Sequence, residues 1–358
     1  MKERIWDYHT QETQDLEFEY LFKPFWHFGC HTSEVANNRD FITLRAFDFE
    51  IIIYNDNGNI IAFYNICPHR GAKLITNESG ENANCVSGNC KIKCEYHHWQ
   101  FSNGKLLIPE RNEFSEYGNL DLLRLKIVHC GDFIFFSDMP KMSLDEQLGE
   151  FYDELTQCST SINHRIDINT KSRFYSNWKI GIENSIDEYH LTFVHPHSLG
   201  ALELWDTPRY SSLNSKGCCE VKNEKIKKKL LKNKSLFLDS NYYEEMYFSY
   251  YLFPFSVVSS TFGYSYGIQN FFPHTPQSTH FVSRSYNVKS KIDTSIFDDG
   301  VITMNRQVFD EDSVPTNLIT TSKYLNPKFV YAKKLEKRIL VFQNTYNKYI
   351  NGGGGVNG

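Results

Sequence analysis

The sequence lacks the long apolar run that a membrane-spanning protein needs. No stretch reaches the roughly 20 consecutive apolar residues that cross a bilayer, and the opening residues, Met1–Asp7, lack the apolar core of a signal peptide. Positive charge is not in excess either: 38 Lys and Arg face 43 Asp and Glu, giving a net charge of −5 and a pI near 6.2. We therefore expect no membrane anchor and no nucleic-acid partner.

Two further patterns are missing from the sequence. No Gly-x-Gly-x-x-Gly run occurs, so the chain itself is not expected to bind FAD or NAD. The nine cysteines are odd in number and irregularly spaced, which does not match a disulfide framework. Metal ligands and free thiols explain them better, and we expect a cytoplasmic protein.

The length and the apolar content indicate two domains with substantial cores. The chain has 358 residues, which exceeds the usual size of a single domain. Of these residues 41% are hydrophobic and 15% aromatic, enough for packed cores. Residues 1–20 are polar and suggest an N-terminal arm or a short helix, and the glycine-rich residues 351–358 suggest a flexible tail. We place the domain boundary after Pro140, which gives domains at 21–140 and 141–350.

Two short segments carry the strongest chemical signal. Cys67–Gly71 has the pattern Cys-x-His, and Cys94–Trp99 has the pattern Cys-x-x-His. A zinc finger usually groups its two cysteines and, separately, its two histidines. Here each segment supplies one of each, which suits a [2Fe–2S] cluster with two Cys on one iron and two His on the other. A structural zinc site is the alternative.

These segments resemble the Rieske iron–sulfur family, including the Pro-His-Arg-Gly run and the Tyr-His-x-Trp run. By this resemblance Cys67, His69, Cys94 and His97 hold the cluster. Two features depart from the family pattern. The spacer between the segments is longer than usual, and His98 stands where many members have a small residue, often glycine.

The segments around these motifs have the composition of β-strands. Residues 41–44, 49–54 and 60–64 are rich in β-branched and aromatic side chains. Asn57-Gly58 and Asn103-Gly104 are hairpin signals. We expect both cysteine–histidine segments to be tips of β-hairpins that face each other across the cluster, and residues 123–128 and 132–136 to close the domain.

A second constellation occupies residues 177–195. Trp178, Ile182, Ile186 and Tyr189 recur at helical intervals and predict one apolar face. Asp187 and His190 are three residues apart and hence neighbours on a helix. His195 follows at a predicted helix end. Two imidazoles beside a carboxylate suit a 2-His-1-carboxylate iron(II) site, although packing is the commoner role of such a pair.

Downstream of a Rieske pattern, this segment resembles the catalytic domain of Rieske non-haem iron oxygenases, through Asn-Trp-Lys, Glu-Asn, an acid, Tyr-His and His-Pro. The resemblance implies an α+β fold: an N-terminal all-β Rieske domain, then a catalytic domain with an antiparallel β-sheet flanked by helices. It also implies a third, carboxylate ligand on a late helix. We choose Asp312, with Asp310 as the alternative, beside His190 and His195.

The family resemblance implies a terminal oxygenase α-subunit. A reductase or ferredoxin, itself fed by NAD(P)H, would supply electrons to the [2Fe–2S] cluster. The electrons would then reach a mononuclear Fe(II) that activates O2 to hydroxylate or oxidatively dealkylate a small organic substrate. Asp187 would orient His190 and connect it to His97 of a neighbouring subunit in a head-to-tail homotrimer. Asp rather than Glu at position 187 counts mildly against a quaternary-amine substrate.

Other segments yield simpler expectations. Ser143–Glu146 is a capping box that starts a helix carrying an apolar stripe to Leu155. Residues 246–286 predict three aromatic-rich strands of an antiparallel sheet. The basic run Lys225–Lys234 predicts a solvated loop or helix face, and the stripe Leu335, Ile339, Phe342 and Tyr346 predicts a final amphipathic helix. The remaining cysteines are expected to be ordinary thiols: Cys30, Cys85, Cys90, Cys130, Cys158, Cys218 and Cys219.

Three alternatives remain open at this point. The chain could be the α-subunit of an aromatic-ring cis-dihydroxylating dioxygenase, although it is short for that class. It could be a Rieske electron carrier or binding protein without oxygenase activity. It could also be a structural zinc protein. The sequence gives no substrate, no site of oxidation and no identity for the reductase.

Overall fold

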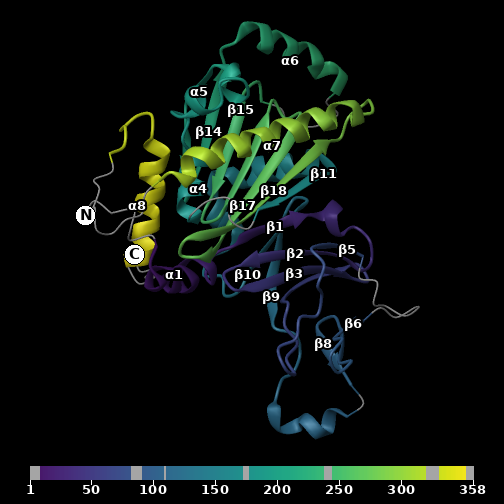
Figure 1. The fold of residues 1–358 in the computed structure, drawn as a ribbon. Coiled ribbons are helices and arrows are strands. Elements are labelled where there is room, and N and C mark those ends of the chain that lie inside the picture. The colour runs from purple at the N-terminus through teal and green to yellow at the C-terminus, as the bar shows by residue number, and fades with distance from the viewer. Residues whose placement is uncertain are drawn as a thin grey trace.

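The computed structural model describes residues 9–81, 91–108, 110–171, 177–237, 244–319 and 330–351, and it contains two large antiparallel β-sheets (Figure 1). The expected α+β fold, with an all-β first half and a sheet-plus-helix second half, is confirmed. Within these residues no helix is long and apolar enough to cross a bilayer.

The first sheet has seven strands in the order β1-β10-β9-β4-β3-β2-β5. Side chains on both faces of this sheet are largely buried, and many of them are β-branched or aromatic, the residue types that favour strands. The expected strands at 41–44, 49–54, 60–64, 123–128 and 132–136 all occur in it. The strands are β1 (His27–His31), β2 (Asp40–Ala46), β3 (Phe49–Asp56), β4 (Asn59–Tyr64), β5 (Ser79–Glu81), β9 (Arg124–Cys130) and β10 (Phe133–Ser137).

Both Asn-Gly signals form tight hairpin turns. Asn57 and Gly58 have φ of 57° and 85°, and Asn103 and Gly104 have φ of 46° and 74°. Two consecutive positive φ values define the type I′ turn, which Asn-Gly adopts at little steric cost. One turn joins β3 to β4. The other joins β7 (Gln100–Ser102) to β8 (Lys105–Leu107), which with β6 (Ile92–Lys93) forms a small sheet at one extremity of the molecule (Figure 1).

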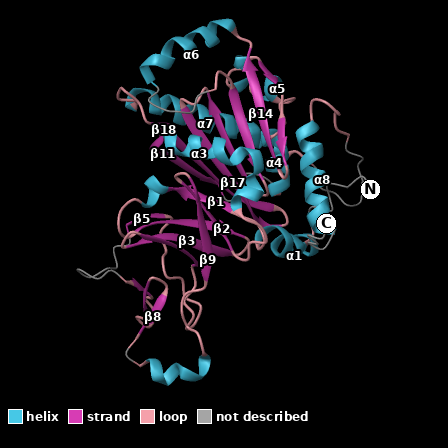
Figure 2. Cartoon of the chain, turned by 180° about the vertical axis from the view of Figure 1, so that it is seen from behind, coloured by secondary structure: helices cyan, strands magenta, loops and turns pink. Residues whose placement is uncertain are grey.

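The second sheet has eight strands: seven in the order β11-β18-β17-β16-β15-β14-β12, and β13, which pairs with β14 beside this path. Its front face packs against α4 and α7 (Figure 1), and its back face packs against α2 and α3, of which α3 is labelled in the view from behind (Figure 2). The strands are β11 (Ile162–Lys171), β12 (Leu204–Asp206), β13 (Arg209–Ser211), β14 (Asn214–Val221), β15 (Tyr247–Leu252), β16 (Ser256–Thr261), β17 (Ser265–Thr275) and β18 (Ser278–Val288).

Helices account for most of the remaining described chain. The α-helices are α1 (Gln11–Glu17), α2 (Leu144–Leu148), α3 (Tyr152–Ser161), α4 (Trp178–Ser185), α5 (Leu191–Val194), α6 (Glu224–Phe237), α7 (Ser295–Asn317) and α8 (Lys337–Asn351). The short 3₁₀ or π turns are η2 (Phe18–Phe22), η3 (Thr32–Val35), η4 (Arg111–Tyr117), η5 (Gly149–Phe151) and η6 (Leu199–Leu202).

Three local predictions need correction. Residues 246–286 form four strands rather than three, because an unpredicted turn at 262–264 separates β16 from β17 while Pro273 lies inside β17. The Ser143–Glu146 capping box is present, but its helix breaks at Gly149, whose φ of 58° ends α2 before α3 begins. Leu335 precedes α8 and is exposed, whereas Ile339, Phe342 and Tyr346 are buried as expected.

The basic run after residue 224 lies on α6, at the edge of the second sheet (Figure 1). Its lysines at 225, 228 and 232 are exposed, which agrees with the expected solvated face. Ile226, Leu230 and Leu231 instead pack against a small apolar cluster under the helix. The helix is therefore amphipathic, with one side turned toward the sheet.

A buried ion pair ties three distant segments together beneath α4. Glu17 of α1 pairs with Lys179 of α4, and both side chains are almost completely buried. The same carboxylate accepts hydrogen bonds from the indole N–H of Trp178 at 2.9 Å and the hydroxyl of Tyr346 on α8 at 2.8 Å. This network fixes the start of α4, which leads directly to the second candidate metal site.

Replacing Glu17 with Gln should destabilise the fold, because Lys179 would lose its buried counter-charge. Breaking a buried pair typically costs about 3–5 kcal/mol. The control Glu19→Gln removes an exposed partner of Lys23 and should cost less than about 1 kcal/mol. Urea unfolding followed by tryptophan fluorescence measures both, and equal stabilities of the two variants would contradict this role of the network.

Candidate metal sites

The first cysteine–histidine loop follows β4 and is closed by a side chain. The Asn65 carbonyl oxygen accepts hydrogen bonds from the N–H groups of Leu74 and Ile75, both at 3.0 Å, and its amide donates to the Ile75 carbonyl at 2.6 Å. The strands on either side, β4 and β5, do not pair with each other. The expectation of a β-hairpin here is therefore wrong. The hydrogen bonds of Asn65 hold the two ends of the loop together in place of the backbone hydrogen bonds of a hairpin.

The second loop is a true hairpin tip, as expected. It connects β6 to β7, and the Cys94 N–H donates to the Trp99 carbonyl at 2.8 Å while the His98 N–H donates back to Cys94 at 2.9 Å. His98 has a φ of 59°. Left-handed backbone favours glycine, so the structure explains why a small residue is common at this position.

The four residues form a buried cysteine pair and an outer histidine pair. Cys67 and Cys94 are buried, and burial together with the neighbouring Cys94 thiol raises the pKa of Cys67 to about 11. The rings of His69 and His97 have centroids 4.5 Å apart, and His97 is exposed. The Trp99 ring stacks on His69 at 4.5 Å. This arrangement fits a [2Fe–2S] cluster, with thiolates on the inner iron and imidazoles on the outer one.

A single tetrahedral zinc ion fits these residues less well. Bonds of 2.0–2.3 Å would put all four donor atoms within about 4 Å of one another. In the described part of the chain, some groups of three ligand atoms lie within 4.8 Å of one another. No such group contains three of the residues Cys67, His69, Cys94 and His97. The pairs are separated, as two bridged irons require.

None of the other cysteines that the structure describes joins these four in a close group of donors. Cys85 and Cys90 lie outside the described residues. Five more are buried, and burial raises the pKa of each thiol and keeps it protonated. They are Cys30, Cys130, Cys158, Cys218 and Cys219.

The second constellation forms where α4 ends. Asn177 caps α4, its side chain accepting a hydrogen bond from the Lys179 N–H, and Trp178, Ile182 and Ile186 are buried as expected. The helix ends at Ser185, five residues before His190, where the predicted helical stretch ends, so Tyr189 is not on this face and is half exposed. The backbone leaves the helix because a turn forms around Asp187.

Asp187 still contacts His190, but through this turn rather than along a helix. One carboxylate oxygen accepts a hydrogen bond from the Tyr189 N–H at 2.8 Å, and the other lies 3.2 Å from His190 Nδ1. His195 ends the short helix α5 and is fully buried. The predicted neighbours therefore meet, with a different backbone from the one expected.

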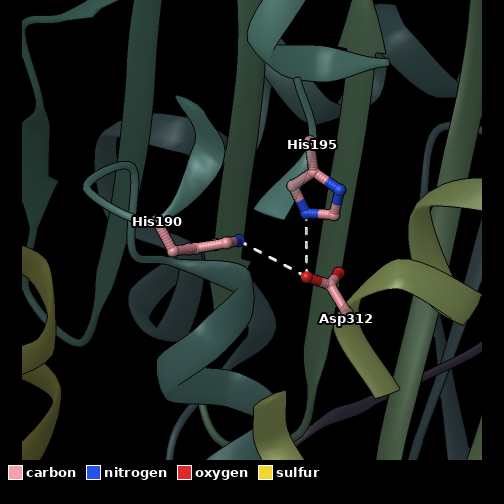
Figure 3. A group of neighbouring side chains, drawn as sticks. All are labelled: His190, His195 and Asp312. Atoms are coloured by element: carbon pink, nitrogen blue, oxygen red, sulfur yellow. Dashed lines mark hydrogen bonds and ion pairs between the residues drawn. The ribbon is translucent and has the colours of Figure 1, made fainter. Parts of the chain in front are cut away.

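Asp312 of α7 brings the two imidazoles together (Figure 3). Its Oδ1 lies 3.4 Å from His190 Nε2 and 2.8 Å from His195 Nε2, and all three donor atoms lie within 4.8 Å of one another. Asp312 is buried, whereas the alternative, Asp310, is exposed on the outer side of α7. The arrangement has the donor set of a 2-His-1-carboxylate site.

Glu311 is a participant that the sequence reasoning missed. Its Oε2 lies 2.7 Å from His195 Nδ1 and also accepts a hydrogen bond from Ser198 at 2.7 Å. Both imidazoles thus have Nδ1 on a carboxylate and Nε2 facing the shared point, which is how metal-binding histidines are commonly oriented. The sequence shows three adjacent acids at 310–312. Only the fold shows that the side chains of Glu311 and Asp312 point toward His195.

Three carboxylates surround the two imidazoles and favour positive charge on them. Burial opposes protonation of His190, but the carboxylates of Asp187 and Asp312 outweigh it and raise the pKa of His190 to about 9. Burial also raises the pKa of Asp312, and the two imidazoles more than reverse this, lowering it to about 2. A group of donors that stabilises two added positive charges so strongly also suits a divalent cation.

A cavity of about 570 Å³ opens directly onto these residues. Asp187, His190, His195 and Asp312 form one end. One wall is the front face of β15–β17, rich in serine, and the facing wall is the apolar side of α7. Its volume lies in the range of small-molecule sites.

Family comparison decides what kind of chain carries these two sites. Residues 25–117 match the Rieske [2Fe-2S] domain, and residues 161–352 match the ring hydroxylating alpha subunit (catalytic domain). The second match alone covers more than half of the chain. The chain belongs to the ring-hydroxylating α-subunit family.

Curated relatives of this ring-hydroxylating α-subunit chain act on different substrates. It is 30% identical to the carnitine monooxygenase oxygenase subunit of Acinetobacter pittii, over 53% of this chain and 51% of that protein. It is 31% identical to the glycine betaine monooxygenase oxygenase subunit of Chromohalobacter salexigens, over 55% and 45%. It is 32% identical to the 2-halobenzoate 1,2-dioxygenase large subunit of Burkholderia cepacia, over 51% and 40%. These matches span about half the length of the relatives.

Solved structures of the family share the fold. A quaternary ammonium Rieske monooxygenase, CntA, in complex with L-carnitine superposes with a TM-score of 0.76 at 18% identity, covering 97% of this chain and 94% of that one. Naphthalene 1,2-dioxygenase from Rhodococcus sp. gives 0.73 at 16% identity, with the same coverage. At these identities the likeness concerns the fold alone.

Replacing His98 tests the backbone strain at the cluster loop. His98→Gly should raise the melting temperature or leave it unchanged, because left-handed backbone costs a non-glycine residue about 1–2 kcal/mol. His98→Val should lower the melting temperature and the fraction of protein that retains the visible absorption of a cluster. Glu95, in the same loop without a positive φ, should show the opposite order, with Glu95→Gly the less stable variant.

Iron analysis separates the two candidate acids on α7. Wild-type protein reconstituted with iron and sulfide should hold about three irons per chain, two in the cluster and one at the mononuclear site. Asp312→Asn should hold about two, because the mononuclear iron loses an anionic ligand. Asp310→Asn is the matched control and should keep all three. A loss in Asp310→Asn without a loss in Asp312→Asn would reverse the assignment.

Proposed function

We propose that this chain is the terminal oxygenase subunit of a Rieske-type oxygenase that hydroxylates or oxidatively dealkylates a small organic substrate. The observation that carries the proposal is the convergence of His190, His195 and Asp312 at the end of a substrate-sized cavity. It occurs in a chain whose other half presents a buried cysteine pair beside a histidine pair. We assign Cys67, His69, Cys94 and His97 to the cluster and the other three to mononuclear iron.

The bound groups would supply the redox chemistry: the cluster provides single electrons, and the mononuclear iron(II) activates O2. The residues of the chain prepare that chemistry. Asp187 and Glu311 hold the Nδ1–H groups of His190 and His195, so that both Nε2 lone pairs face the metal position. Asp312 supplies the anionic ligand, and the cavity holds the substrate beside it.

The two sites are separated within one chain. Figure 1 shows the small sheet that carries Cys94 and His97 at one extremity and α5 of the mononuclear site in the other half. The surface beside Asp187 exposes the aromatic side chains of Tyr189, Phe193 and Trp205. The cluster tip exposes Tyr96 and His97. These surfaces support a head-to-tail homotrimer, in which Asp187 connects His190 to His97 of the partner subunit.

Further parts of the proposal rest on the sequence and on the family. The electron donor is a separate reductase or ferredoxin supplied by NAD(P)H, and the compartment is the cytoplasm. The chain divides into a Rieske domain at 21–140 and a catalytic domain at 141–350. The substrates named for the relatives, carnitine, glycine betaine and 2-halobenzoate, are all carboxylates, so a carboxylated substrate is our first choice.

Mixed trimers test the activity and the route of the electrons together. His190→Ala should keep the cluster absorption but lose product formation and the O2-dependent reoxidation of a chemically reduced cluster. Cys94→Ser should lose the cluster and be inactive. Co-expressed in equal amounts, the two variants should recover about one quarter of wild-type product per chain, because one junction in four pairs an intact cluster with an intact neighbouring iron site.

The assay uses carnitine, glycine betaine, 2-chlorobenzoate and anthranilate as substrates, with product detected by mass spectrometry. An inactive mixture that contains trimers would show that electrons stay within one subunit. A His190→Ala variant with unchanged function would identify the chain as an electron carrier instead. A diol product would favour the ring-dihydroxylating alternative.

A further inference from the structure

A row of small residues crosses the sheet under the cavity. Strand pairing places Ser249 opposite Ser259, Ser259 opposite Gly267, and Gly267 opposite Ser285. Side chains on one strand alternate between faces, so Gln269, two residues beyond Gly267, points to the same side. The row leaves a trough in the sheet, and Gln269 stands at its edge.

The Gln269 side chain reaches over Gly267 into the cavity. Its Nε2 lies 3.0 Å from the position that a Cβ on Gly267 would occupy, and Ser259 Oγ lies 3.2 Å from the same position. Gln269 lines the cavity and is 6% exposed. Within the described part of the chain, its amide has no hydrogen-bond partner. A buried amide of this kind is normally paired, so a ligand group is the natural partner.

The surroundings specify the charge and shape of that ligand. Lys229 of α6 is the one lysine or arginine among the described residues that line the cavity. Two acids, Asp187 and Glu188, line the metal-binding end. The wall from α7 is apolar and includes Val301, Met304 and Phe309. A ligand with an apolar body and an anionic end held apart from these two acids fits these charges.

We propose that Gln269, with Ser259 beside it, forms the subsite that binds a carboxylate of the substrate. The Gln269 amide N–H can donate to a carboxylate oxygen, and the Ser259 hydroxyl can join it by turning from its long, 3.4 Å hydrogen bond to the Gly267 carbonyl. Lys229, the one basic residue of the described lining, contributes a favourable potential. This inference depends on the proposed function only in taking the cavity as the substrate site. Gly267 is part of the subsite because a side chain there would occupy the space between the two donors.

Direct binding measures the subsite without turnover. Isothermal titration of the iron- and cluster-loaded protein would compare anthranilate with anthranilamide, and glycine betaine with choline. Wild type should bind at least one carboxylate about tenfold or more tightly than its partner. Gln269→Leu should weaken the binding of that carboxylate by about 10- to 100-fold, because a hydrogen bond to a charged group is lost. The affinity for the partner compound should stay within about twofold of wild type.

Two further variants keep the test decisive. Gln269→Glu preserves the shape and should weaken carboxylate binding by charge repulsion. Its melting temperature should fall, because the new carboxyl group is buried, while its circular-dichroism spectrum should stay unchanged. Gln11→Leu is the matched control on the exposed surface of α1 and should bind like wild type. Equal affinities of wild type and Gln269→Leu for the carboxylates would overturn the proposal. So would tighter binding of the partners that lack a carboxylate, or no binding of any carboxylate.

The outcomes separate this inference from the proposed function. Carboxylate binding that depends on Gln269, in a protein that forms no oxygenated product, would support the subsite and refute the oxygenase. If product forms and Gln269→Leu has the same KM for the carboxylated substrate as wild type, the oxygenase would be supported and the subsite refuted.

Discussion

The catalytic half depends on burying one carboxylate between two imidazoles. Asp312 lies on α7, more than a hundred residues from His190 and His195, and its charge is almost completely withdrawn from water. An isolated buried carboxylate would be strongly unfavourable. It is tolerable only with positive charge beside it, either protons on the imidazoles or a metal ion. That requirement couples α7 to the end of α4 and, through these elements, to the whole sheet beneath them.

The same demand for paired charge recurs behind the site. Asp187 and Glu311 neutralise and orient the outer edges of the two imidazoles, and Glu188 pairs with the fully buried Arg338 of α8 at 2.6 Å. Below them the Glu17–Lys179 pair fixes the start of α4. Each pair joins segments that are distant in sequence. Together these pairs fix the orientation of the candidate metal ligands before a metal binds.

The other half places its candidate ligands at a surface rather than in a cavity. The two thiols lie inside, where Asn65 and the hairpin hydrogen bonds hold their loops, while His97 reaches the surface. In the proposed function, an exposed imidazole edge would bring the outer iron close to a docking partner. The cavity lined by Gln269 has the opposite character, because its lining is largely buried. The fold would then separate an exposed electron entry from an enclosed site of oxidation.

The sequence by itself determined the candidate ligands, the hairpin turns and the order of the two halves. Those features are local: Asn-Gly specifies a type I′ turn, and the Cys–His spacing specifies a loop-borne ligand pair. Tertiary structure decided the rest. It ended α4 before Asp187, closed the first loop with Asn65, buried Asp312 rather than Asp310, and directed Glu311 and Gln269 inward. Adjacent residues of one helix point in different directions, and only the packing of that helix determines which of them reaches the site.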